Sequence, residues 1–498
     1  MRKFISYLTI ATIVLGFAAC NNEDVPNPET GKGDTYVGLT IKFPVASTTR
    51  VLPDDYNKQD GTWQGRDVIK GLTVYVVNTN EETINKTSFP QTAFHGITAD
   101  GELNPKLAIP ATSGHNVRAY VVINDVNNKV TDLLNDASVT AVNFATKFDE
   151  AVAQVTAVTN VATTEGTGIN TKDIVVMTNK VMPSDMTVQA NITEAQAISG
   201  PTNQMKVEVS RVAARGIVTI KDGYTTAVNV KNNQGTTTSV ITIRDVQYQV
   251  TGSALQFNVL EDRTYWQVPT DVYGYIPTGD NSTWPPANPS PANIMLYTDA
   301  TNWKTVIAKA DNTNPNVIAA LGEEEYSKFV LPVTHADANY KKGNTTMFEI
   351  KATFTPDNVD GEAFTGGTTP ATVYLGMKDG LFYSTKAKAE EMDASFTGGT
   401  AVNHKQDVRE YTGGTMYYYI WLNPNKAYGE AEKITMSPTV RNQVYHAHII
   451  GFAEIGVANK DEIDPDDPLQ TDKTYISVQL KVLPWTIHSY TVELGNYY

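Results

Sequence analysis

Residues 36–45, YVGLTIKFPV, form the stretch that sets the strand pattern of this chain. Apolar side chains alternate there with polar or small ones, the period of a strand with one buried face. The apolar members are Val37, Leu39, Ile41 and Phe43. Small polar residues follow and end at Arg50. Runs of the same kind at 72–77, 117–123, 347–354 and 416–422 predict further strands.

The chain has 498 residues, which is enough for two or three domains with cores of their own. Its 41% hydrophobic and 19% charged residues are ordinary for a globular protein, and its 25 Tyr favour β-structure. We therefore expect a mainly β fold of two tandem β-sandwich-like domains with a few short helices.

The charge and cysteine content exclude several classes of function. A net charge of -15 argues against nucleic acid as a partner, because affinity for phosphates depends on Lys and Arg. The single Cys is Cys20, close to the N-terminus. The domains that follow therefore hold no thiol for a disulfide, a nucleophile or a metal site.

Residues 1–20 have the three parts of a secretory signal: two basic residues, an uncharged apolar run, and small residues before Cys20. A Cys at this place is typical of a bacterial lipoprotein signal, in which acyl chains on its thiol hold the precursor on a membrane. The alternative is an ordinary signal peptide with a Cys near its cleavage site. Residues 21–34 are polar and predict a tether.

The remaining chain divides at changes of pattern. We expect a propeptide over 21–50 that holds the tether and the first strand, an N-terminal domain over 51–216 and a C-terminal domain over 217–460. Helical spacing predicts one amphipathic helix over about 140–155, and apolar alternation predicts separate strands at 240–243 and 246–250. Residues 461–498 begin as an acidic linker broken by two prolines.

Two apolar alternations follow this linker. The first consists of Ile476, Val478, Leu480 and Val482, and after Trp485 the second consists of Tyr490, Val492 and Leu494. Both segments have the pattern of a strand with one buried face, and one interpretation is that they are strands of the chain's own second sheet.

Five segments carry a resemblance to a known family. They are HAD at 335–337, YKKGNTT at 340–346, YYYIWLNPN at 417–425, MSP with RN at 436–442, and VLPWTIHSY at 482–490. With them the chain resembles the type V pilins, or fimbrillins, of the Bacteroidales, and within that family the shaft subunit of the short fimbriae. The resemblance agrees with two transthyretin-like β domains.

The resemblance implies a maturation route. The precursor would reach the outer membrane as a lipoprotein carrying palmitate on Cys20, and an arginine-specific protease would cleave between Arg50 and Val51. A donor strand from the C-terminal region would then join copies head to tail in an extracellular fimbrium, with anchor and tip subunits at its ends. The sequence leaves Arg66 open as a second cleavage site.

The resemblance also bears on partners and alternatives. A fimbrium implies adhesion, biofilm formation and virulence, with receptors on host or bacterial surfaces. The alternative function is a tip adhesin, or a surface lipoprotein that binds glycan or host protein without polymerising. Such a protein has no use for a C-terminal donor strand.

No pattern in the sequence points to an enzyme or a cofactor. His446 and His448 share one face of a strand at a spacing that suits zinc, but no third ligand is evident, and we interpret them as ordinary strand histidines. Phosphate-loop and nucleophile-elbow motifs are missing from the sequence. We expect no catalytic residue, metal or cofactor.

Overall fold

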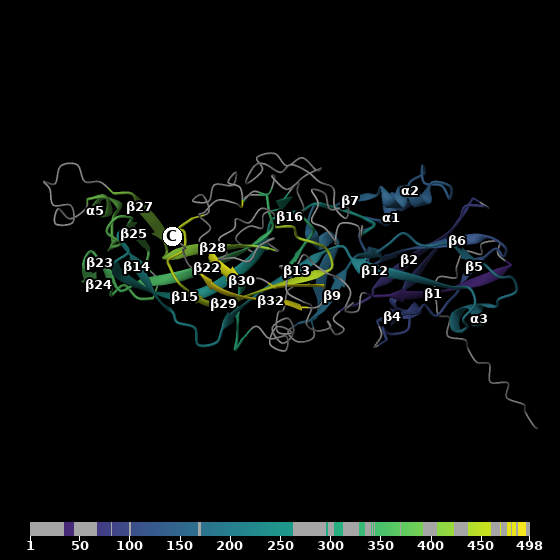
Figure 1. The fold of residues 1–498 in the computed structure, drawn as a ribbon, viewed down its shortest axis with the longest axis horizontal. Helices are drawn as coiled ribbons and strands as arrows, with labels where there is room; N and C mark the ends of the chain where they lie inside the picture. Colours follow the sequence, from purple (N-terminus) through teal and green to yellow (C-terminus); the bar gives the residue numbers. More distant parts are fainter. Residues whose placement is uncertain are drawn as a thin grey trace, which may run out of the picture.

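The computed structural model describes residues 34–43, 67–80, 82–98, 101–167, 171–261, 295–296, 303–311, 328–333, 340, 342, 344–368, 370–391, 406–422, 437–459, 469, 476–479, 481–484 and 487–494. This part of the chain is mainly β with a few short helices, as predicted, and the arrangement as two tandem β-sandwich-like domains stays a prediction. Figure 1 shows an elongated molecule with one large sheet at one end and the small sheet around α5 at the other.

The sheet at the N-terminal end has nine strands, with the main order β3-β2-β6-β10-β12-β1-β4. Two short strands join it, as β11 pairs with β6 and β5 pairs with β1. The bounds are β1 Thr35–Lys42, β2 Gly71–Asn78, β3 Thr83–Pro90, β4 Glu102–Leu103, β5 Ile109–Ala111, β6 Asn116–Ile123, β10 Met177–Asn179, β11 Met186–Thr187 and β12 Gln204–Arg211.

Apolar side chains pack on both faces of this sheet, because successive side chains of a strand point to opposite faces. One face holds Leu72, Val74 and Val76 of β2 in a core shared with β1. The other face presents Tyr75 and Tyr120, which lie 5.3 and 4.7 Å from Phe144 between ring centroids. Phe144 belongs to α2 (Phe144–Asp149), next to α1 (Thr131–Leu134).

The helix predicted over 140–155 is therefore wrong in extent. It stops at Asp149, and β7 (Val152–Gln154) follows. β7 pairs antiparallel with β17 (Gln256–Asn258), and the amide of Val155 donates to the Leu255 carbonyl at 2.9 Å. Pairing with a distant strand overrides the local helical spacing here.

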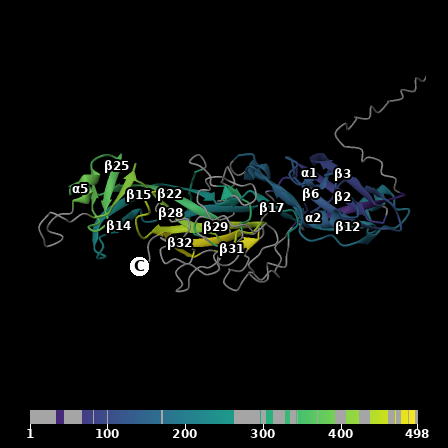
Figure 2. The same ribbon diagram turned by 90° about the horizontal axis from the view of Figure 1, so that it is seen from above.

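A second sheet of seven strands has the main order β20-β13-β29-β32-β30, with β21 on β13 and β31 on β29. Its strands come from distant parts of the chain. The bounds are β13 Ala214–Lys221, β20 Ile307–Lys309, β21 Lys328–Val330, β29 Gln443–Phe452, β30 Ile476–Gln479, β31 Lys481–Pro484 and β32 Ile487–Leu494. Figure 2 shows β29, β31 and β32 beside β22 and β28 of the next sheet.

The third sheet has the main order β14-β15-β22-β28, with β19 on β15. The bounds are β14 Ala227–Lys231, β15 Thr237–Thr251, β19 Lys304–Thr305, β22 Met347–Pro356 and β28 Thr415–Trp421. The two strands predicted at 240–243 and 246–250 are one strand, β15. Its register against β22 shifts between Arg244 and Gln247, where Asp245 has a φ of 49°.

Smaller elements complete the described part. The paired strands are β8 Ala162–Glu165 with β9 Lys172–Val175, β16 Ser253–Ala254 with β18 Met295–Leu296, β23 Asn358–Val359 with β24 Glu362–Ala363, and β25 Thr372–Gly376 with β26 Phe382–Tyr383 and β27 Val408–Thr412. The short helices are η1 Gln91–Ala93, η2 Val158–Asn160, α3 Glu194–Ser199 and α5 Lys386–Glu390.

The chain crosses from the first sheet to the second through Val212 and Ala213, which are both fully buried. The largest apolar cluster contains Tyr75 on one side of this crossing and Phe452 on the other, so the core continues across it. The predicted division at residues 216 and 217 stays a proposal. Among the described residues, no helix is long and apolar enough to span a membrane.

Candidate functional site

The candidate site is the slot that β1 occupies in the first sheet. β1 runs parallel to β12, with Gly38 opposite Gln204 and Lys42 opposite Glu208. On its other side it pairs antiparallel with β4 and β5, which have two and three residues. One long strand and two short ones therefore supply the backbone partners of β1.

The apolar side chains of β1, and that of Phe43 directly after it, belong to the core of this sheet. Their exposed fractions are 0% for Val37, 5% for Leu39, 0% for Ile41 and 7% for Phe43. Burial of four such side chains contributes about 6–12 kcal/mol at roughly 1.5–3 kcal/mol each. The alternation in residues 36–45 thus predicted the buried face of this strand.

Polar contacts anchor the N-terminal end of β1. The Thr35 hydroxyl donates to the Gln189 carbonyl at 2.9 Å, and the Tyr36 amide donates to the Ile192 carbonyl at 3.2 Å. The Ser113 hydroxyl donates to Asp34 Oδ2 at 2.6 Å, and this hydrogen bond holds the pKa of the Asp34 carboxyl below its ordinary value. These contacts join β1 to segments far along the chain.

The remaining predicted positions stand as follows. Cys20, Arg50, Val51, Leu480 and Trp485 lie outside the described residues. The other members of the two C-terminal alternations lie in β30, β31 and β32. β32 runs parallel to β29 from Val444 opposite Ile487 onward, and β30 pairs antiparallel with β32. In a single chain these strands therefore belong to its own second sheet, and their use as a donor stays a proposal.

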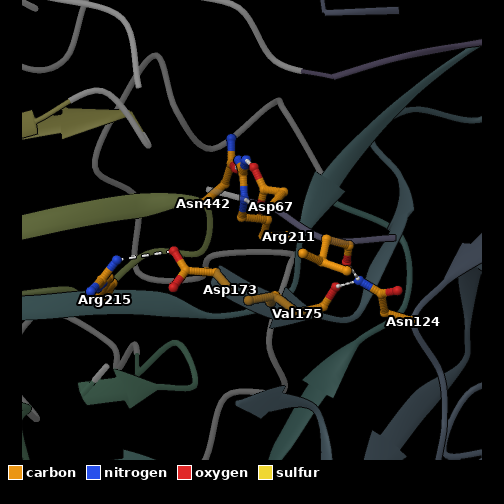
Figure 3. Close-up of polar contacts among 8 residues, drawn as sticks. Asp67, Asn124, Asp173, Val175, Arg211, Arg215 and Asn442 are labelled. Carbon is orange, nitrogen blue, oxygen red and sulfur yellow. Dashed lines mark hydrogen bonds and ion pairs between the residues drawn. The ribbon is translucent and has the colours of Figure 1, made fainter. Parts of the chain in front are cut away.

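A buried ionic network lies at the crossing between β12 and β13 and is drawn in Figure 3. Arg211, the last residue of β12, holds the Asp67 carboxylate with two nitrogens and donates to Asn442 Oδ1 at 2.9 Å. Arg215 Nη1 donates to Asp173 Oδ2 at 3.0 Å, and both side chains are fully buried. The network joins Asp67, which lies shortly before β2, to Asn442, the residue that precedes β29.

Arg441 extends this network through main-chain groups. Its guanidinium donates to the carbonyls of Arg211 at 2.9 Å, Ser210 at 3.0 Å and Asn258 at 3.1 Å. Carbonyl acceptors of this kind satisfy the planar donors of a buried arginine. Sequence reasoning missed this network, although basic residues inside the apolar run 211–218 were a signal of buried ion pairs.

His446 and His448 lie on β29, and both rings contact the hydroxyl of Thr219. Thr219 Oγ1 is 2.7 Å from His446 Nε2 and 2.8 Å from His448 Nδ1. Burial lowers the pKa of His448. Within the ranges that the structure describes, no group of three or more His, Cys, Asp or Glu side chains is placed to hold a metal ion.

Comparisons with known proteins point to one family. The model of the fimbrillin C-terminal region, described as "Major fimbrial subunit protein type IV, Fimbrillin, C-terminal", matches residues 409–491. The minor fimbrium subunit Mfa1 of Porphyromonas gingivalis is 28% identical over 539 aligned residues, which cover 98% of this chain and 99% of that protein.

Solved structures of lower similarity were also found. A fimbrilin from Porphyromonas gingivalis W83 is 15% identical with a TM-score of 0.39, covering 93% of this chain and 99% of its own. The tip fimbrial protein Mfa3 of Porphyromonas gingivalis is 10% identical with a TM-score of 0.29, and the match covers 83% of this chain and 94% of that one. The family model and the full-length relative confirm the resemblance inferred from the sequence: this chain is similar along nearly its whole length to a fimbrium subunit, and its residues 409–491 match the fimbrillin C-terminal model.

Proposed function

We propose that this chain is a structural subunit of a fimbrial shaft and is made as a lipoprotein precursor. After cleavage on the C-terminal side of Arg50, copies would polymerise because a strand of one copy replaces β1 of the next. The observation that carries the proposal is the place of β1. A strand with three buried apolar side chains, followed directly by the buried Phe43, lies between β12 and β4, and it precedes Arg50 in the sequence. Cleavage there separates the strand covalently from the sheet that it completes.

Loss of β1 exposes two kinds of unsatisfied surface. The backbone of β12 loses its partner over the five register pairs from Gln204 to Glu208. The pockets of Val37, Leu39, Ile41 and Phe43 open to water. A strand from another copy restores both the ladder and the apolar contacts by β-augmentation.

The two ends of this contact lie on different surfaces of the subunit. The slot is in the first sheet, while β30, β31 and β32 belong to the second. A contact between unlike surfaces propagates from copy to copy, and it produces an open filament when the rotation does not close. The mature form would be extracellular in the fimbrium, with tip and anchor subunits as partners and surface receptors as targets.

The named relatives are fimbrial subunits, which agrees with the expectation that this chain is not an enzyme. The lipid on Cys20 and the protease are parts of the proposal and follow from the sequence pattern and the family resemblance. Before cleavage, acyl chains at Cys20 would hold the precursor on the outer membrane. After cleavage, the lipid and β1 would leave together.

The test compares purified precursor, without lipid, before and after treatment with an arginine-specific protease. We expect filaments by electron microscopy only after treatment, and Val51 as their first residue by N-terminal sequencing. Arg50→Lys is the matched variant, since it keeps the charge but removes the cleavage site, and it should remain monomeric. Filaments of full-length Arg50→Lys protein would contradict the proposal, and monomers that persist after cleavage at Arg50 would favour a non-polymerising surface protein.

A further inference from the structure

Helix α3 covers the slot of β1 on the face opposite the apolar core. Gly38 is buried under this helix, and its amide donates to the Asn203 carbonyl at 2.8 Å. A Cβ atom built on Gly38 overlaps the Ala197 carbonyl oxygen and Gln204 Nε2, and lies 2.8 Å from the Ala197 carbonyl carbon. We call this contact between α3 and position 38 the glycine gate.

The gate consists largely of backbone, which has little freedom to move aside. Thr193 caps α3 by accepting from the Gln196 amide at 3.3 Å, and the Gly200 amide closes the helix on the Gln196 carbonyl at 2.8 Å. Ala197 is fully buried. Every residue except glycine carries a Cβ, so only glycine fits at the gate position of a strand that occupies the slot.

The first C-terminal alternation does not meet this condition. When Ile476, Val478, Leu480 and Val482 fill the four apolar pockets in the direction of β1, Ser477 falls at the gate. In the reverse direction Lys481 falls there. Residues 474–484 contain no glycine.

The second alternation meets the condition in the reverse direction. Gly495 then occupies the gate, and the pockets of Leu39, Ile41 and Phe43 receive Leu494, Val492 and Tyr490. The pocket of Val37 receives Asn496, a polar mismatch. In the direction of β1, by contrast, Gly495 would place Asn496 in the Leu39 pocket.

We propose that residues 490–495 of a second copy fill the slot antiparallel to β12, with Gly495 under α3. This assignment rests on the proposed function and identifies which C-terminal segment is exchanged and in which register. The reversed strand is antiparallel to β12 and parallel to β4 and β5, whereas β1 is parallel to β12 and antiparallel to the other two, so the direction is decided by the glycine gate and not by ladder type. The register also places Glu493 opposite Lys206, a favourable cross-strand pair of opposite charge.

The donor segment must leave its own sheet to reach the slot. In the single chain, Tyr490, Val492 and Leu494 of β32 pair with Ala447, Ile449 and Phe452 of β29. The slot offers a ladder on both sides as well, from β12 on one side and from β4 and β5 on the other. The exchange therefore substitutes one set of backbone pairs for another, and the empty pockets of the cleaved subunit favour it.

Cysteine cross-linking tests the register because Cys20 is the only Cys and precedes the predicted cleavage site. Position 40 of β1 lies opposite Lys206. The proposed register puts Glu493 at that position, whereas the first alternation puts Gln479 there in either direction. The two matched variants are Lys206→Cys with Glu493→Cys, and Lys206→Cys with Gln479→Cys.

After cleavage and mild oxidation, we expect the Glu493→Cys variant to give a ladder of disulfide-linked oligomers on a non-reducing gel. The Gln479→Cys variant should stay unlinked. Gly495→Val should abolish filament growth while Ser477→Val grows normally, and both precursors should unfold at the same temperature as the unmodified one. Asn496→Val should accelerate growth by removing the polar mismatch.

Cross-linking through Gln479, or normal filaments from Gly495→Val, would overturn the assignment while strand replacement itself stands. Filaments that form but link through neither pair would overturn it too. If the cleaved, unmodified chain forms no filaments at all, the proposed function itself fails, so the two failures are distinguishable.

Discussion

Replacing Arg211 by Met removes the cation from a carboxylate that the fold has taken out of water. The side chains of Arg211 and Asp67 are only 4% and 7% exposed. Removal of one partner of a buried ion pair costs about 3–5 kcal/mol, because the other charge stays buried without compensation. Met keeps much of the volume of the arginine stem, so this cost reflects the lost charge rather than a cavity.

The matched control is Arg118→Met. Arg118 Nε lies 2.8 Å from Asp185 Oδ1, and a second nitrogen lies 3.2 Å from Oδ2, so the geometry of the pair is also bidentate. Its side chains are 34% and 49% exposed, and such surface pairs contribute about 0–1 kcal/mol.

Urea unfolding of both variants, followed by intrinsic fluorescence, measures the difference. We expect a much larger loss of unfolding free energy for Arg211→Met than for Arg118→Met. Equal losses would refute the reasoning that burial of the Asp67 pair sets its strength.

Three further predictions follow from the same structure. The segment after Asp67 is held by hydrogen bonds, since the Val68 amide donates to the Asp173 carbonyl at 2.9 Å and the Lys70 amide donates to Asn124 Oδ1 at 2.7 Å. Because Arg211→Met removes the partner of Asp67, an arginine-specific protease should cut after Arg66 in this variant but not in the unmodified protein, and mass spectrometry of the digest measures this. Gly38→Val should destabilise the precursor by about 1–3 kcal/mol through overpacking at the gate and leave the cleaved protein unchanged in a thermal melt. Burial, with a smaller contribution from Lys221, lowers the pKa of His448 from 6.5, against the opposing field of Asp311. The unfolded chain therefore takes up the proton first, and the stability of the fold decreases as the pH drops below 6.5. The urea midpoint of His448→Gln should fall less over that acid range than the midpoint of the unmodified protein, and equal slopes would refute this assignment.

The sequence predicted the elements whose side chains alternate against one core. β1, β2 and β6 were visible because their apolar residues follow the period of a strand. The helix at 140–155 was overestimated because β7 pairs with β17, which comes about a hundred residues later in the chain. Periodicity carries no information on such distant pairing, and the single strand β15 was divided in the prediction where its register shifts at Asp245.

The candidate site was predicted in part for the same reason. The buried face of β1 follows from its own residues, whereas the glycine gate depends on α3, which packs over Gly38 from residues 194–199. The ionic network depends on partners as far apart as Asp67, Arg211 and Asn442. A single sequence shows that such residues are unusual among apolar neighbours, but it does not show which of them meet.

The two ends of β12 differ in how they are held, and this difference orders the events in the slot. At its C-terminal end β12 pairs with β10 through Val209, Ser210 and Arg211, and the Lys180 amide donates to the Glu208 carbonyl at 2.8 Å. Its N-terminal residues, from Gln204 onward, are those that pair with β1. When β1 leaves, residues 209–211 keep their pairing with β10, whereas residues 204–208 lose their ladder partner in the slot. We expect an incoming strand in the proposed register to pair first near Glu208 through Tyr490 and Val492, and Gly495 to enter last, because the contact with α3 has little freedom to move aside.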